Sequence, residues 1–114
     1  MLLNIRADFN KCDSDVWSPL ISACSEGVSE IVNMLLDIGA DYNKCCNDGW
    51  SPLMIACNDG HTEIVRMLLD KGADYNTFNS DGKSAVIIAS ERGHSSIVRV
   101  MNEHTTLNTA IQLK

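Results

Sequence analysis

The sequence predicts an all-α protein built from stacked pairs of short helices, and three observations support this. The same residues recur 33 positions apart, as at Trp17 and Trp50 or at Gly39 and Gly72. Each copy carries two short apolar segments with helical spacing, separated by a glycine. Hydrophobic residues make up 45% of the 114 positions, which suffices for one packed core. A repeat of this length predicts a solenoid, because one short helix pair buries its apolar face only by stacking on its neighbours.

The middle copy shows most clearly where each helix should begin and end. Ser51 followed by Pro52 is an N-cap before the one helical position that tolerates proline, so we expect the first helix to start there. Gly60 is expected to end this helix. A second helix, capped by Thr62, is expected to end at Gly72, which supplies the left-handed residue found after many helices. Ser18 is the equivalent of Ser51 in the first copy, and Ser29 and Ser95 are the equivalents of Thr62 in the other two copies.

The repeated block resembles the ankyrin repeat. Its middle copy reads Asp-Gly-Trp-Ser-Pro-Leu, then Gly-His, a Val-x-x-Leu-Leu segment and Gly-Ala-Asp, and the resemblance extends from about residue 2 to residue 104. It implies an all-α ankyrin-repeat solenoid of helix-turn-helix units with turn or loop connections. It also implies a structural hydrogen-bonding role for His61 and His94. The chain departs from the family pattern at Ile21, Met54 and Ile87, where the family usually has histidine.

The register of the repeats divides a single domain into five parts. They are a partial N-terminal repeat (1–12, the end of a second helix plus a loop), repeat 1 (13–45), repeat 2 (46–78), a divergent, cap-like repeat 3 (79–104) and a C-terminal tail or short helix (105–114). Asn102 falls where a core leucine is expected, so the last second helix is expected to fray from there. Residues 1–10 align with residues 34–43. The chain is therefore either a piece of a longer array or has a poorly covered N-terminal edge.

Charge and hydropathy limit the classes of partner. The formal net charge is −6, which argues against nucleic acid and anionic membranes, because phosphate binding needs clustered lysine and arginine. No apolar run approaches 18 residues, so no membrane span is expected. We expect a protein partner, with a basic surface as one option, and a location in the cytoplasm, with the nucleus as an alternative.

The five cysteines do not form a recognisable catalytic or metal motif. Cys24 and Cys57 lie in apolar segments and are expected to be buried thiols, which favours a reducing compartment. Cys45 and Cys46 are adjacent in a connecting loop, but no histidine or basic cluster is near them in the sequence to lower a thiol pKa. We therefore expect no catalytic, cofactor-binding or metal site, and a thiol-dependent enzyme is the less favoured alternative.

Polar and aromatic residues recur at the turn tips and at the ends of the first helices. In an ankyrin-like stack these positions share one concave face, so the acids would form two ladders on it, opposite a second-helix face that holds basic residues. Two tryptophans at repeat spacing would form binding hot spots there. The alternatives are a solvated acidic surface and a recently duplicated aromatic. The candidate partner-binding residues are Asp15, Trp17, Glu26, Asn47, Asp48, Trp50, Asn58, Asp59, Asp81 and Lys83.

The predicted function is that of a non-enzymatic protein-interaction module, which binds its partner through the concave face of turns and first helices. The alternative is a structural segment of a longer ankyrin array with no dedicated partner. A monomer is expected, with weak self-association through Leu2, Leu3 and Ile5 at the open N-terminal edge as a further option.

Overall fold

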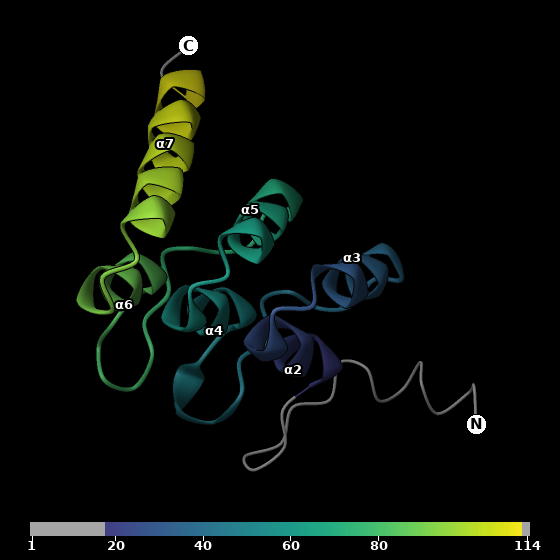
Figure 1. Ribbon diagram of the computed structural model, residues 1–114. Helices are drawn as coiled ribbons and strands as arrows, with labels where there is room; N and C mark the ends of the chain where they lie inside the picture. Colours follow the sequence, from purple (N-terminus) through teal and green to yellow (C-terminus); the bar gives the residue numbers. More distant parts are fainter. Residues whose placement is uncertain (1–17, 113–114) are drawn as a thin grey trace, which may run out of the picture.

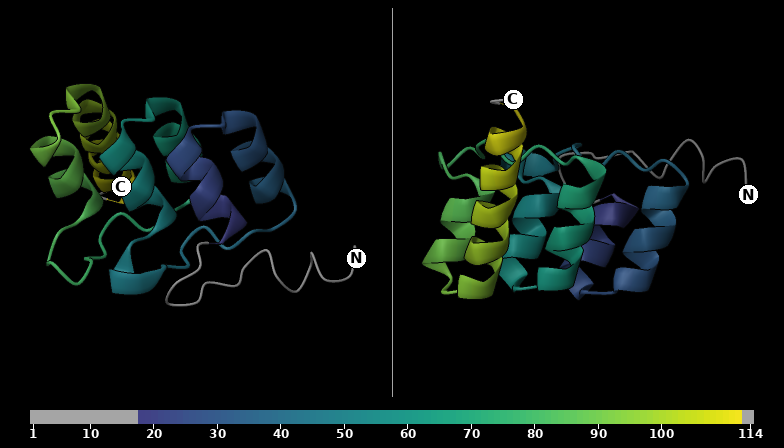
Figure 2. Two further views of the ribbon diagram at one scale, coloured as in Figure 1. Left: turned by 60° about the horizontal axis from the view of Figure 1, so that its bottom comes forward. Right: turned by 90° about the horizontal axis from the view of Figure 1, so that it is seen from above.

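The computed structural model describes residues 18–112, which fold into three stacked helix pairs (Figure 1). Within that range there are six α-helices and no strand. The first helices form one layer and the second helices the other (Figure 2). The predicted all-α solenoid is confirmed. The elements are α2 (Pro19–Glu26), α3 (Ser29–Asp37), the 3-10 helix η1 (Asn47–Gly49), α4 (Pro52–Asp59), α5 (Thr62–Lys71), α6 (Ala85–Glu91) and α7 (Ser95–Gln112).

The first helices begin where the Ser-Pro pairs predict. The Ser51 hydroxyl accepts a hydrogen bond from the Met54 amide at 3.2 Å, and the Ser18 hydroxyl accepts one from Ile21 at 3.3 Å. Each bond satisfies an amide that has no partner within the helix. In the third unit Ser84 precedes α6 but makes no side-chain cap bond. The first two helix starts are therefore fixed locally.

The second helices do not begin as predicted. Ser29 and Thr62 are the first helical residues rather than N-caps, and the N-cap positions are held by Val28 and His61 without a side-chain cap bond. The amide of His61 donates to the carbonyl of Ala56, in the last turn of α4, at 3.0 Å. The closing turn of the first helix thus extends to His61, and α5 starts at the next residue. Gly72, in contrast, ends α5 with φ +102° as predicted.

His61 and His94 join successive units, which confirms their structural role. The Nε2 atom of His61 donates to the carbonyl of Ser25, and that of His94 donates to the carbonyl of Asn58, both at 3.1 Å. The rings lie so close to the preceding unit that a Cβ atom on Gly27 would come within 2.6 Å of the His61 ring. Glycine is needed there both for this approach and for the φ of +76°.

One continuous apolar core runs through the three units. α2 packs on α4 and α4 on α6, while α3 packs on α5 and α5 on α7. Cys24 and Cys57 are buried as predicted. Ile21 and Met54 are also buried, so two of the three positions that depart from the family pattern pack in the core, whereas Ile87 at the third is exposed.

The last helix is longer than predicted. The expected fraying from Asn102 is wrong: α7 continues without a break to Gln112, across the predicted boundary between residues 104 and 105 (Figure 1). In the second unit Gly72 ends the helix, whereas the equivalent residue in the third unit is Thr105, and no glycine follows Gly93. Without a left-handed residue to end it, the helix propagates. Residues 105–112 are thus part of α7 rather than a separate short helix.

Candidate protein-binding surface

A groove of about 460 Å³ crosses the layer of first helices. It receives residues from all three units, since Ser25 comes from α2, Asn58 and Asp59 from α4, and Arg92 from the end of α6. The remaining lining residues are Cys46, Asp48, Trp50 and Ile55. We call the surface formed by the turns and by α2, α4 and α6 the first-helix face. Four of the residues predicted to bind a partner line this one groove.

The turn at Asp48 has an unusual backbone. Asp48 has φ +64° and is the one residue other than glycine with a positive φ between Ser18 and Gln112. Its carbonyl accepts a hydrogen bond of 2.8 Å from the amide of Ser80, in the next turn. The side chain of the buried Asn79 then accepts bonds from the amides of Asp81 and Lys83. Successive turn tips are thus tied together, which fixes the backbone at Asp48, a residue that lines the groove.

Trp50 is less exposed than the sequence suggested. Its side chain is half-buried and packs against the core, and its carbonyl accepts a hydrogen bond from the Cys46 amide at 2.8 Å. The prediction of a tryptophan that faces outwards is therefore only partly right, because the indole forms one wall of the groove while also contributing to packing. Trp17 and Asp15 lie outside the described residues, and Asn47 is described only as the first residue of η1.

A chain of hydrogen bonds connects the ends of the three first helices. Arg92 Nε donates to Asn58 Oδ1 at 2.8 Å, Asn58 Nδ2 donates to Asp59 Oδ1 at 2.9 Å, and the Ser25 hydroxyl donates to Asp59 Oδ2 at 3.2 Å. Arg92 was missed by the sequence prediction. The 33-residue register could have indicated it, because Arg92 occupies in the third unit the position of Glu26 and Asp59. The row of acids at the ends of the first helices, Glu26 and Asp59, is therefore followed by a basic residue, Arg92, in the third unit.

The turn-tip acids lie on the surface. Asp48 and Asp81 are exposed, as is Glu26 at the end of α2. Lys83 takes the place of Trp50 in the third unit, and its ammonium lies 2.8 Å from the Glu91 carboxylate. The hydrogen bond to Glu91 and its negative charge raise the pKa of Lys83. The third unit thus presents an ion pair where the second presents an aromatic ring.

The buried thiols stay protonated at neutral pH. Burial raises the pKa of Cys24 and of Cys57 to about 12. Cys46 is buried and Cys45 is half-buried, with its sulfur 3.7 Å from the carbonyl of Asn43.

Among the residues that the structure describes, no three His, Cys, Asp or Glu side chains gather closely enough to hold a metal ion. No helix within residues 18–112 has the length and apolarity needed to cross a membrane.

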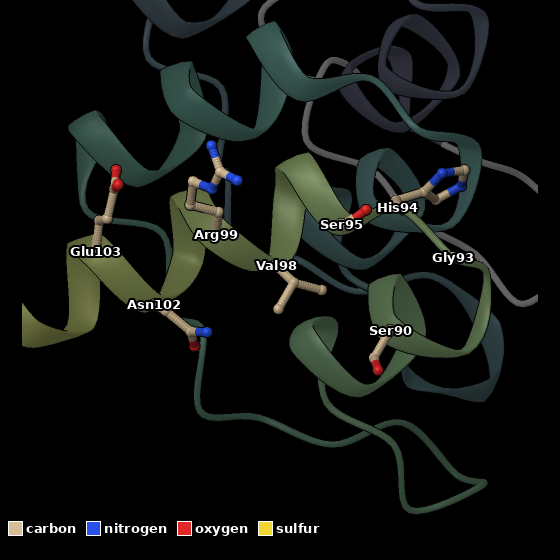
Figure 3. Close-up of a pocket in the computed structure, with 8 residues that line it drawn as sticks. All are labelled: Ser90, Gly93, His94, Ser95, Val98, Arg99, Asn102 and Glu103. Carbon is tan, nitrogen blue, oxygen red and sulfur yellow. The ribbon is translucent and has the colours of Figure 1, made fainter.

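A further hollow, of about 740 Å³, lies on the outer face of the third unit (Figure 3). Ser90 on α6 and Val98 and Asn102 on α7 project from this side. The equivalent residues of the second unit, Cys57, Val65 and Leu69, are all buried between units. The hollow is therefore the outer end of the stack, where two of the three positions carry polar side chains.

Comparison with known families agrees with this architecture. A family model described as ankyrin repeats, in three copies, matches residues 1–79. No curated protein matches the chain. The third helix pair, α6 and α7, lies outside the matched residues, but it continues the stack through the packing of α6 on α4 and of α7 on α5. Because the match spans most of the 114 residues, the chain belongs to the ankyrin repeat family.

Proposed function

We propose that this chain is a non-enzymatic protein-interaction module that binds a protein partner through its first-helix face. The groove that joins three units on this face is the observation that supports the proposal best. Ankyrin repeats generally act as protein-protein interaction modules and are typically not enzymes. The residues proposed to contact the partner are Asp15, Trp17, Glu26, Asn47, Asp48, Trp50, Asn58, Asp59, Asp81 and Lys83.

The acids of the first-helix face favour a partner with a basic surface. Glu26, Asp48 and Asp81 are exposed on this face. The second helices expose both signs of charge, with Arg66, Lys71 and Arg99 among Glu30, Asp37, Glu63, Asp70 and Glu103. Exposed acids on the first-helix face speed the encounter with a positively charged partner. This effect is expected to weaken as salt screens the exposed charges.

Reversing charges on the first-helix face should abolish partner capture. We expect a variant with Glu26→Lys and Asp81→Lys, immobilised and exposed to native cell extract, to lose partners that the wild type retains. The matched control carries Glu63→Lys and Asp70→Lys, which make the same change in net charge at exposed positions of α5. Capture is measured by quantitative mass spectrometry, after circular dichroism has shown that both variants fold. Loss of the same partners in the α5 variant alone would contradict the proposal.

The alternative, a structural segment of a longer array, is favoured by the outer face of α3. Ile31 is 47% exposed and Met34 is 63% exposed, although Ile64, at the position of Ile31 in the next unit, is 1% exposed because α3 packs on α5. An apolar helix face of this kind is normally covered in a stack.

If α3 docks on another repeat surface, the chain should self-associate at high concentration. We expect light scattering during chromatography to show a mass that falls on dilution, and Met34→Lys to yield a monomer at every concentration. Ile87→Lys, on the exposed side of α6, is the matched control. A wild-type chain that stays monomeric at several hundred micromolar would leave this alternative without support.

A further inference from the structure

The groove on the first-helix face combines apolar walls with two carboxylates. Trp50 and Ile55 provide apolar surface, while Asp48 and Asp59 both line the same hollow of about 460 Å³. A ligand group that fits must therefore have an apolar stem and a positively charged end. Among natural side chains only arginine and lysine combine the two.

Neither carboxylate is neutralised by a cation of the described chain. The Asp48 side chain makes no hydrogen bond or ion pair with residues 18–112. Each oxygen of Asp59 accepts one hydrogen bond, from Asn58 or from Ser25, and a carboxylate oxygen can accept two. Arg92 lines the groove but directs its Nε at the Asn58 amide rather than at either acid. Both carboxylates thus keep capacity for a further donor.

We propose that the groove receives an arginine side chain from an extended segment of the protein partner. The aliphatic stem lies along Ile55, the planar guanidinium stacks on the Trp50 indole, and its fork of N–H groups bonds to Asp48 and Asp59. Arginine fits better than lysine, because the guanidinium is planar, is weakly hydrated and donates two parallel bonds to a carboxylate. Stacking of the cation on tryptophan adds to the attraction. This inference rests on the proposed function and names the chemistry of the partner at the same face.

The fluorescence of Trp50 allows a direct test. The chain has two tryptophans, so Trp17→Phe places the signal on Trp50 alone. Because Trp17 is itself proposed to contact the partner, an acetylated and amidated peptide of four Arg-Ser repeats is titrated into both the wild type and this variant, beside peptides with citrulline or lysine in place of each arginine. Citrulline keeps the shape of arginine without its charge. We expect saturable quenching by the arginine peptide, with binding about tenfold weaker for citrulline, as expected when a charge-assisted bond is lost, and an intermediate value for lysine.

The contribution of the carboxylate is tested with Asp48→Asn. Asparagine tolerates the left-handed backbone of this position, so the turn is preserved. We expect binding of the arginine peptide to weaken at least about fivefold, whereas Asp70→Asn, which removes the same charge from α5, changes it less than about twofold. Equal binding of the citrulline peptide, equal effects of the two variants or no quenching by the arginine peptide would each overturn the inference. In those cases the loss of extract partners in the Glu26→Lys, Asp81→Lys variant would still support the proposed function, so the two failures can be told apart.

Discussion

Replacing Leu68 with alanine should lower the free energy of unfolding by about 2–5 kcal/mol. Leu68 is fully buried in α5, and α5 packs against both α3 and α7. Truncation removes apolar contacts within the shared core and leaves a cavity that a closely packed interior closes only in part. At about 0.05–0.15 kcal/mol of stability per residue, the loss is a large fraction of the total for a chain of this length.

A matched control separates burial from the mere loss of an apolar side chain. Met34→Ala removes a similar side chain from α3, but Met34 is 63% exposed, so its cost should stay within about 0.5 kcal/mol. Urea unfolding is followed by far-ultraviolet circular dichroism and by tryptophan fluorescence. Because the three units share one core, we expect both signals to move together to lower urea in the Leu68 variant. Two separate transitions would show that the loss is confined to one unit.

The helix starts and unit boundaries that depend on neighbouring residues were predictable from the sequence. Ser51 and Pro52 define the start of α4 through a local hydrogen bond and a fixed φ, so no distant contact is needed. The recurrence of residues at 33 positions is also visible without a structure. It predicted the stacking. The apolar segments predicted the burial of Cys24 and Cys57, and the resemblance to ankyrin repeats implied a hydrogen-bonding role for the two histidines, but their partners were not predicted.

Features that depend on contacts between units could not be predicted in the same way. The half-burial of Trp50 depends on packing against the core, and the bonds from Arg92 to Asn58 and from Ser25 to Asp59 join residues 34 apart. The start of α5 at Thr62 depends on how the preceding helix closes rather than on the capping preference of threonine. The sequence thus indicated the acids of the groove, and its register could have indicated Arg92, but the hydrogen bond from Arg92 to Asn58 is visible only in the stacked units.

Alkaline solution should destabilise the fold through its buried thiols. The pKa of Cys24 and of Cys57 is raised to about 12 in the folded chain, from an ordinary value of 9.0, because burial removes water from the thiolate. Because the pKa of each thiol is higher in the folded chain, the contribution of these thiols to stability is fully present below pH 9. It is lost between pH 9 and about pH 12, since only the unfolded chain releases the thiol proton in that window. At pH 10 each thiol should cost about 1.4 kcal/mol, and the pair about 3 kcal/mol.

The difference between the wild type and a Cys24→Ala, Cys57→Ala variant isolates this effect from the titration of lysine and tyrosine. Alanine does not ionise and is small enough for both sites. The variant therefore loses some packing energy, by the same amount at every pH, but it has no thiol at these sites whose ionisation lowers its stability in alkali. We expect the difference in unfolding free energy, measured by urea titration, to be constant from pH 7 to pH 8.5 and to shrink by about 3 kcal/mol at pH 10. Parallel pH profiles would mean that the two thiolates are solvated in the folded chain, which would contradict the close packing of α2 and α4 around them.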